Sequence, residues 1–237
     1  MITAHAGCDG TPDNSMEYLL HAMELPVDAL EVDLRKNEKG DLVLSHDPGS
    51  GPAVSLADAF TLLCAHPEKK MNCDLKVSGL EQDVAQLARK CGVGDRLIFT
   101  GTVNPELFRK GKSAFPQVAW FANLELFHPE AENWKEPGFR TEAATEAFSK
   151  MVLQLKQYET AGINLNFRAA EKIWEKAGEM GIGLSLWTVN EEEDLRVWLR
   201  RGVRNITSRN ITGILNLQKY ERKQRKDESI GHNPAGK

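Results

Sequence analysis

The sequence lacks an apolar run approaching the roughly 18 residues that a membrane span requires. Its first residues, MITAHAGCDG, also lack a basic start followed by an apolar stretch. We therefore expect no secretory signal, no integral membrane contact and a cytoplasmic location. The formal net charge of −4 argues against a surface devoted to nucleic acid, which would favour a basic stripe.

Closely spaced cysteine pairs are absent as well, because Cys8, Cys64, Cys73 and Cys91 form no CxxC or CxxxC motif. A structural zinc site is therefore not expected. A chain of 237 residues can build its own core without disulfides, so we interpret the cysteines as reduced thiols. Internal repeats and low-complexity tracts are missing too, and the oligomeric state is left open.

What the sequence does contain is an alternation of short β-rich segments with helical ones. Expected helices are Ser55–Cys64, Leu80–Lys90, Glu142–Thr160, Arg168–Met180 and Glu191–Arg200. Expected strands are Ile2–His5, Ala29–Leu34 with a hairpin partner Asp41–His46, Met71–Val77, Arg96–Thr100, Gln117–Ala122, Gly162–Leu165, Gly183–Val189 and Arg204–Thr207.

Strands that alternate with helices of about ten or more residues are typical of crossover units and a parallel sheet. About eight such units favour a closed (β/α)8 barrel, although an open doubly wound sheet has the same local pattern. We expect a single α/β domain over residues 1–217. The charged segment 218–237 is expected to be a flexible C-terminal tail.

Acidic and basic side chains alternate along two of the expected strands. Glu31 and Asp33 share one strand face, and Asp74 and Lys76 share a face of the next parallel strand. Parallel strands are covered on both faces, so acids there need a counter-charge. Three carboxylates indicate a site for a hard cation such as Mg²⁺ or Ca²⁺. A salt bridge from Lys76 to one acid, with the others solvated, explains the spacing equally well.

Two histidines, His5 and His46, each close an expected strand and each precede a turn. A lone histidine is more often structural than catalytic. Beside a metal, however, two imidazoles can divide the roles of general base and general acid, because histidine titrates near neutral pH.

Several motifs together make the chain similar to a known family. The segment HAGCDGTPDNSMEYLLHAMELPVDALEVDLRKNEKGDLVLSHDP resembles the opening of the glycerophosphodiester phosphodiesterases, with their His-Arg-Gly, Pro-Glu-Asn-Thr, Glu-x-Asp and His-Asp motifs. NCDLK is similar to the family's Glu-x-Lys strand, and SLWTVNEEEDLRVWLRRGVRNITSRN to its Trp-Thr-Val-Asn stretch and last barrel strand. The resemblance covers residues 2–213 and is thinnest over 100–180; it implies the closed barrel.

The resemblance also implies roles for individual residues. His5 and His46 become the acid–base pair, and Glu31, Asp33 and Asp74 hold the divalent metal. Lys76 neutralises phosphate charge, and Trp187 lines the pocket or is a core aromatic. Asn14 is interpreted as a helix N-cap or turn residue. The implied partner is a small-molecule phosphodiester, hydrolysed to an alcohol and glycerol 3-phosphate.

Three departures from the family pattern leave alternatives open. The arginine after the first histidine is Ala6 here, the third acid is Asp74 rather than Glu, and the family's insertion is reduced to about Pro48–Lys70. A smaller lid leaves room for a lysophospholipid-cleaving barrel, for which the segment 120–127 supplies apolar residues. Because the arginine is missing, a non-catalytic barrel that binds phosphoesters is also an alternative.

Overall fold

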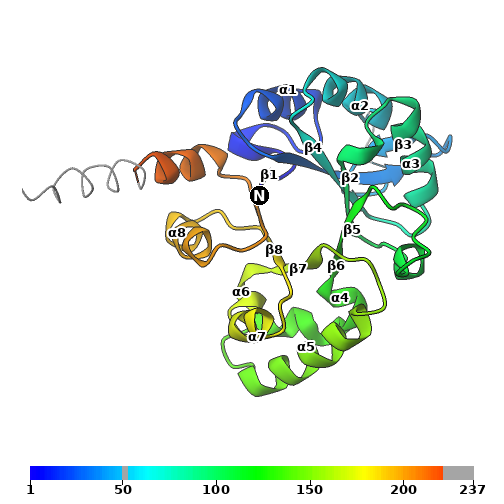
Figure 1. The fold of residues 1–237 in the computed structure, drawn as a ribbon. Coiled ribbons are helices and arrows are strands. Elements are labelled where there is room, and N and C mark those ends of the chain that lie inside the picture. Colours follow the sequence, from blue (N-terminus) through cyan, green and yellow to red (C-terminus); the bar gives the residue numbers. More distant parts are fainter. Residues whose placement is uncertain (50–52, 221–237) are drawn as a thin grey trace, which may run out of the picture.

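The computed structural model describes residues 1–49 and 53–220. Eight parallel strands form a closed barrel, and the antiparallel strand β3 (Leu42–Leu44) extends it from β2 (Figure 1). The barrel strands in chain order are β1 (Ile2–Ala4), β2 (Ala29–Lys36), β4 (Lys70–Leu75), β5 (Leu97–Gly101), β6 (Ala119–Asn123), β7 (Gly162–Asn166), β8 (Leu184–Trp187) and β9 (Asn205–Ser208). Pairing of β1 with both β2 and β9 closes the circle, so the expected (β/α)8 barrel is confirmed and the open sheet is excluded.

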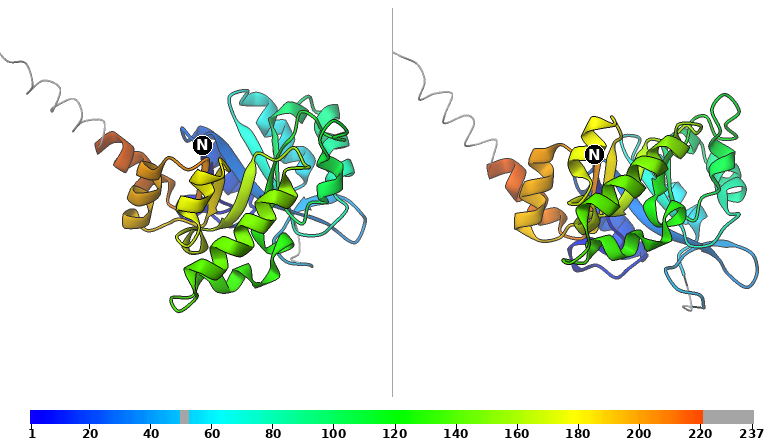
Figure 2. Two further views of the ribbon diagram at one scale, coloured as in Figure 1. Left: turned by 60° about the horizontal axis from the view of Figure 1, so that its bottom comes forward. Right: turned by 90° about the horizontal axis from the view of Figure 1, so that it is seen from below.

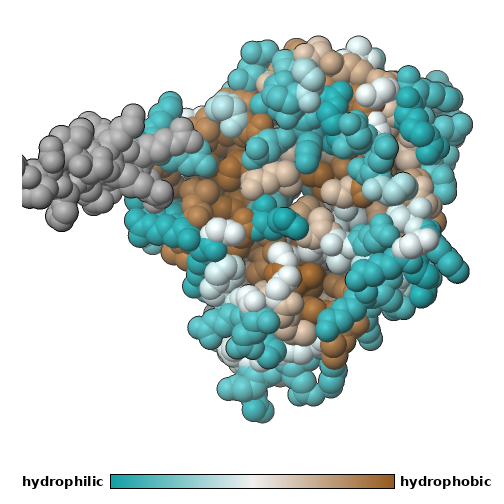
Figure 3. Space-filling model, viewed as in Figure 1, coloured by the Kyte–Doolittle hydropathy of each residue, from teal (hydrophilic) through white to brown (hydrophobic). Residues whose placement is uncertain are grey.

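Helices surround the barrel and turn their apolar sides toward it, while hydrophilic residues cover most of the outer rim of the face in Figure 3 (Figures 2 and 3). They are α1 (Met16–Glu24), α2 (Leu56–Ala65), α3 (Glu81–Lys90), α4 (Leu124–Phe127), α5 (Thr141–Leu155), α6 (Phe167–Ala170), α7 (Trp174–Glu179) and α8 (Glu192–Arg201). Short 3-10 turns are η1 (Cys8–Gly10), η2 (Gly94–Arg96), η3 (Pro105–Phe108) and η4 (Pro129–Lys135). No helix within the described ranges is long and apolar enough to cross a bilayer.

Local sequence signals explain several helix ends. Ser55 caps α2, because its hydroxyl accepts a hydrogen bond from the Asp58 amide at 3.1 Å. Gly202 ends α8 in the left-handed conformation (φ 65°), which costs a glycine little. Asn190 precedes α8, and its side chain accepts a hydrogen bond from the Arg209 amide at 2.9 Å. That bond ties the loop before α8 to the end of β9.

Two expected helices differ from the structure. Glu142–Thr160 ends at Leu155, and Arg168–Met180 is divided into α6 and α7. Between β5 and β6 the chain forms only the short turn η3 in place of a covering α-helix. The expected tail 218–237 lies outside the described residues except for 218–220, which continue a helix that begins at 211. All four cysteines are free.

A candidate metal and phosphodiester site

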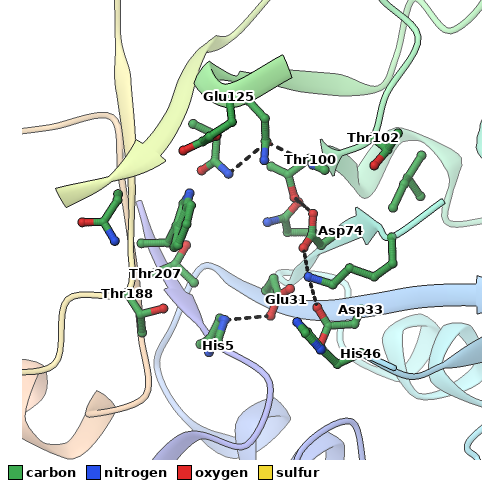
Figure 4. Close-up of a pocket in the computed structure, with 18 of the residues that line it drawn as sticks. His5, Glu31, Asp33, His46, Asp74, Thr100, Thr102, Glu125, Thr188 and Thr207 are labelled. Carbon is green, nitrogen blue, oxygen red and sulfur yellow. Dashed lines mark hydrogen bonds and ion pairs between the residues drawn. The ribbon is translucent and has the colours of Figure 1, made fainter. Parts of the chain in front are cut away.

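A cavity of about 770 Å³ lies at the carboxyl ends of the barrel strands. The strand ends reach it in turn, from His5 after β1 to Arg209 after β9. All seven residues proposed from the sequence line this one cavity: His5, Glu31, Asp33, His46, Asp74, Lys76 and Trp187. Figure 4 shows the side chains of the labelled members directed toward a common space.

Strand alternation and register bring three carboxylates together. Glu31 and Asp33 both turn inward from β2, and each is only 4% exposed. Asp33 pairs in register with Asp74 on β4. One carboxylate oxygen from each of the three residues lies within 4.8 Å of the others. The two-residue spacing on adjacent parallel strands therefore produces a compact oxygen-rich cluster.

Hydrogen bonds from neighbouring segments orient these carboxylates. The backbone amide of Ala6 donates to Glu31 Oε2 at 3.0 Å. Asn14 Nδ2 donates to Asp33 Oδ2 at 2.7 Å, and Asn14 Oδ1 accepts from the Asp33 amide at 3.0 Å. Asn14 is thus a turn residue with φ 53°, as the sequence suggested, but its side chain fixes Asp33 rather than capping a helix. The N-cap of α1 is Ser15.

Lys76 spans two of the acids. Its Nζ lies 2.8 Å from Asp33 Oδ1 and 2.5 Å from Asp74 Oδ2. Burial raises the pKa of Asp33, but the charge of Lys76 and the hydrogen bonds from Lys76 and Asn14 outweigh burial and leave it below its usual value. The interpretation in which Lys76 pairs with a single acid is wrong, because it contacts two.

Ionisation of Glu31 is the least favourable among the three carboxylates of the cluster, because Glu31 is buried beside two other acids. Burial, followed by the charges of Asp33 and Asp74, raises the pKa of Glu31 well above its ordinary value. If all three carboxylates ionise, Lys76 offsets only one charge and a net charge of −2 remains. A divalent cation with oxygen ligands matches both that charge and that donor set. The residues present therefore fit such a cation.

The two histidines lie in different surroundings. His5 Nε2 is 3.8 Å from Glu31 Oε2, and 23% of the His5 side chain is exposed. Burial, and then the nearby charge of Arg209, lowers the pKa of His5 to about 4, so His5 is neutral at pH 7. His46 is 63% exposed, and its Nδ1 lies 3.0 Å from Asp47 Oδ1. In the view of Figure 4, Glu31 lies between the two imidazoles.

Away from the carboxylates, the lining includes several amide and hydroxyl side chains: Thr100, Thr102, Asn123, Asn164, Asn166, Thr188 and Thr207. Trp187 ends β8 and is half-buried at the lining, so the alternative of a fully enclosed core aromatic does not hold. Glu125 also points into the cavity from α4, and burial raises its pKa. Near it, Lys135 Nζ and Glu132 Oε1 form an ion pair at 3.0 Å.

Sequence reasoning missed Arg209, Asp13 and Glu125, which all line the cavity. Each lies in a loop or helix start beyond a strand end, where no two-residue alternation marks it. The RN dipeptide after the last strand was visible only as part of the family resemblance. The opposite signs of Asp13 and Arg209 gave no local signal, because 196 positions separate them.

A second mixed cluster, Cys8, Asp9 and His21, also has ligand atoms within 4.8 Å of one another. Its carboxylate is already used: Asp9 accepts hydrogen bonds from the Thr212 amide and hydroxyl, both at 3.1 Å, and contacts His21 Nε2 at 3.2 Å. Burial raises the pKa of the Cys8 thiol to about 12. This cluster ties the loop after β1 to the C-terminal helix.

Solved structures share this fold over nearly the whole chain. A glycerophosphodiester phosphodiesterase from Thermotoga maritima is 18% identical, with 92% of this chain and 96% of that chain covered and a TM-score of 0.64. One from Parabacteroides distasonis is 14% identical, with 93% and 98% covered and a TM-score of 0.68. An Oleispira antarctica phosphodiesterase in complex with sn-glycerol-3-phosphate is 16% identical, with 91% and 95% covered and a TM-score of 0.65.

No family model matches the sequence, and no curated protein matches it either. At these identities the likeness establishes the barrel. The chemistry depends on the residues that line the cavity.

Proposed function

We propose that this protein is a metal-dependent phosphodiesterase that hydrolyses glycerophosphodiesters to an alcohol and glycerol 3-phosphate. The observation that carries the proposal is the convergence of three carboxylates, one lysine and two histidines on one cavity at the carboxyl ends of the barrel strands. Active sites of α/β barrels occupy this end. The motif resemblance and the fold shared with glycerophosphodiester phosphodiesterases support the same reaction.

Glu31, Asp33 and Asp74 would hold the divalent cation, Mg²⁺ or Ca²⁺. When bound, such an ion supplies electrophilic stabilisation of charge on phosphoryl oxygens. Lys76 lies beside the same carboxylates and lines the cavity, so its ammonium adds positive charge where a phosphate would sit. Trp187 would form part of the wall against the substrate.

We assign the general base to His5 and the general acid to His46. The low pKa of His5 leaves its imidazole neutral, so it can accept the proton of the attacking hydroxyl. His46 is well exposed and can exchange protons with solvent before it protonates the leaving alkoxide. The attacking hydroxyl is either water or a hydroxyl of the substrate itself, in which case water opens the resulting cyclic phosphate.

The lysophospholipid alternative has less support. It requires apolar residues around the cavity, yet Trp120, Phe121, Ala122 and Leu124 are at most 3% exposed and pack inside the protein. Within the segment 120–127, only Leu126 is both substantially exposed, at 46%, and part of the lining. A small polar alcohol suits the amide and hydroxyl side chains of the lining better than an acyl chain.

The deciding experiment is a hydrolysis assay on a panel of glycerophosphodiesters and lysophospholipids, with EDTA and with added Mg²⁺ or Ca²⁺. We expect metal-dependent release of glycerol 3-phosphate, which Glu31→Gln abolishes. Glu38→Gln, an exposed carboxylate of the hairpin turn, is the matched control and should keep wild-type activity. Binding of glycerol 3-phosphate without turnover of any diester would favour the non-catalytic barrel and contradict the proposal.

A further inference from the structure

Arg209 follows β9 directly, and its backbone is held on both sides. Its amide donates to Asn190 Oδ1 at 2.9 Å, and its carbonyl accepts from the Asp9 amide at 2.7 Å. The preceding residue, Ser208, accepts a hydrogen bond from the amide of His5 at 2.9 Å. Arg209 therefore stands at a fixed position beside the strand end that carries His5, and its side chain lines the cavity.

The guanidinium is oriented by Asp13. Arg209 Nη1 donates to Asp13 Oδ1 at 2.5 Å and Nη2 to Asp13 Oδ2 at 2.7 Å. This end-on pairing uses two of the five N–H groups of arginine. The remaining donors, on Nε and on the outer sides of both Nη atoms, make no hydrogen bond with residues 1–49 or 53–220. The Arg209 side chain is 37% exposed, so an anion in the cavity can reach these donors.

The backbone of the first loop is shaped around this pair. Gly7 has φ 78°, and a Cβ placed there would lie 2.1 Å from Asp13 Oδ1 and 2.9 Å from Arg209 Nη1. A side chain at position 7 would displace both partners. The glycine thus permits the close approach of the Asp13–Arg209 pair to the loop that follows His5.

The other positions that could present a positive charge to a phosphate in the cavity are occupied differently. Ala6, which replaces the arginine of the related motif, is fully buried in the core, so position 6 presents nothing to the cavity. Lys76 is engaged by Asp33 and Asp74, and Lys135 by Glu132. Among the described residues, Arg209 is the arginine that lines the cavity, and its guanidinium keeps N–H donors that are not used by Asp13.

We propose that Arg209 binds the non-bridging phosphate oxygens of the substrate, with Asp13 as its positioning residue. The guanidinium that the first strand lacks is then supplied from the last strand, across the seam where β1 meets β9. A planar fork matches phosphate geometry in a way that an ammonium cannot. This inference rests on the proposed function and adds a phosphate-binding residue to it.

The test measures binding of sn-glycerol 3-phosphate and inorganic phosphate by calorimetry, with kcat and KM on a glycerophosphodiester in parallel. Arg209→Met should weaken binding of glycerol 3-phosphate by about 10- to 100-fold, as expected for loss of charge-assisted hydrogen bonds. Arg209→Lys should recover less than half of that loss, because a lysine lacks the fork. Asp13→Asn should raise KM more than it lowers kcat, because the guanidinium remains but is less well oriented.

Arg196→Met is the matched control, since it breaks an exposed arginine–carboxylate pair on α8, with Glu192 at 2.7 Å, away from the cavity. It should bind glycerol 3-phosphate like the wild type. The inference is overturned if folded Arg209→Met or Arg209→Lys binds glycerol 3-phosphate within twofold of the wild type while the wild type hydrolyses the diester. A wild-type protein with no turnover would instead refute the proposed function.

Discussion

Replacing Lys76 with methionine tests the charge balance of the cavity. Burial lowers the pKa of Lys76, but Asp74 and Asp33 outweigh burial and hold it above its ordinary value. Removing one partner of a buried ion pair costs about 3–5 kcal/mol. One fifth of the Lys76 side chain is exposed, at 21%, so we expect the lower end of that range. In a chain of this size, a loss of about 3 kcal/mol lowers Tm by roughly 6–12 °C.

The same substitution should improve binding of a divalent cation. Without the ammonium, the ionised carboxylates of Glu31, Asp33 and Asp74 carry a charge of −3 rather than −2, and Lys76 no longer competes for their oxygens. A cation at a concentration of about 100 times its Kd stabilises the folded state by about 2.7 kcal/mol. Metal should therefore restore most of the lost stability, while kcat/KM stays at least about 100-fold below the wild type.

Thermal unfolding in EDTA and in Mg²⁺ or Ca²⁺, followed by kinetics at saturating metal, measures both effects. Lys36→Met is the control, because Lys36 and Asp83 form an exposed pair at 2.5 Å whose loss costs about 1 kcal/mol or less. A Lys76→Met variant that is as stable as the wild type in EDTA would refute the ion-pair reasoning. Near-normal turnover of that variant in metal would show that the phosphate binds elsewhere.

Four further substitutions probe other parts of the cavity. His5→Ala and His46→Ala should each lower turnover by about 100-fold or more with an unchanged circular dichroism spectrum; a variant with near-normal turnover would make that histidine structural. Gly101→Ala should cost about 2–4 kcal/mol in urea unfolding and weaken metal binding, because the residue has φ 78° and a Cβ there would lie 2.3 Å from Asp74 Oδ1; wild-type stability and metal affinity would contradict this. Burial raises the pKa of Glu125, so the stability of the wild type should fall as pH rises from the unfolded-state pKa of this carboxyl through its raised folded-state pKa. Glu125→Gln should lack that fall and be more stable than the wild type at pH 7. A less stable variant would argue that Glu125 has a stabilising partner.

Strands and hairpin were predictable because a covered strand needs a short apolar run between turn residues. Expected strand Ala29–Leu34 covers β2 except for its last two residues, and the hairpin partner Asp41–His46 contains all of β3. Helix ends were less predictable. The segment Arg168–Met180 keeps helical spacing throughout, yet Ile173 has φ −128° between α6 and α7. The spacing of apolar residues does not predict such a break, since packing against the barrel decides where a helix ends.

The candidate site divides in the same way. Glu31, Asp33 and Asp74 were recognisable because alternation along a covered strand makes inward acids conspicuous, whereas Trp187 and the roles of His5 and His46 needed the family resemblance. Asn14 was interpreted as a helix N-cap or turn residue, yet its side chain donates to Asp33, 19 positions away in sequence. The side chain of Asn190 likewise accepts from the amide of Arg209, 19 positions away. The sequence alone does not indicate whether the hydrogen-bond partner of an asparagine side chain is near or far along the chain.

Strand and helix alternation alone left barrel closure open, although the family resemblance implied it, and the proposed phosphate-binding side of the cavity depends on closure. Ala4 pairs in register with Ser208, so the next residues, His5 and Arg209, emerge at the same level of two adjacent strands. In an open doubly wound sheet the first and last strands need not be neighbours. The Asp13–Arg209 pair would then have no reason to form, and the guanidinium would be far from His5. The carboxylates of β2 and β4 need only the pairing of those two strands. The proposed metal half of the site therefore depends on that one pairing, while the proposed phosphate half needs the closed barrel.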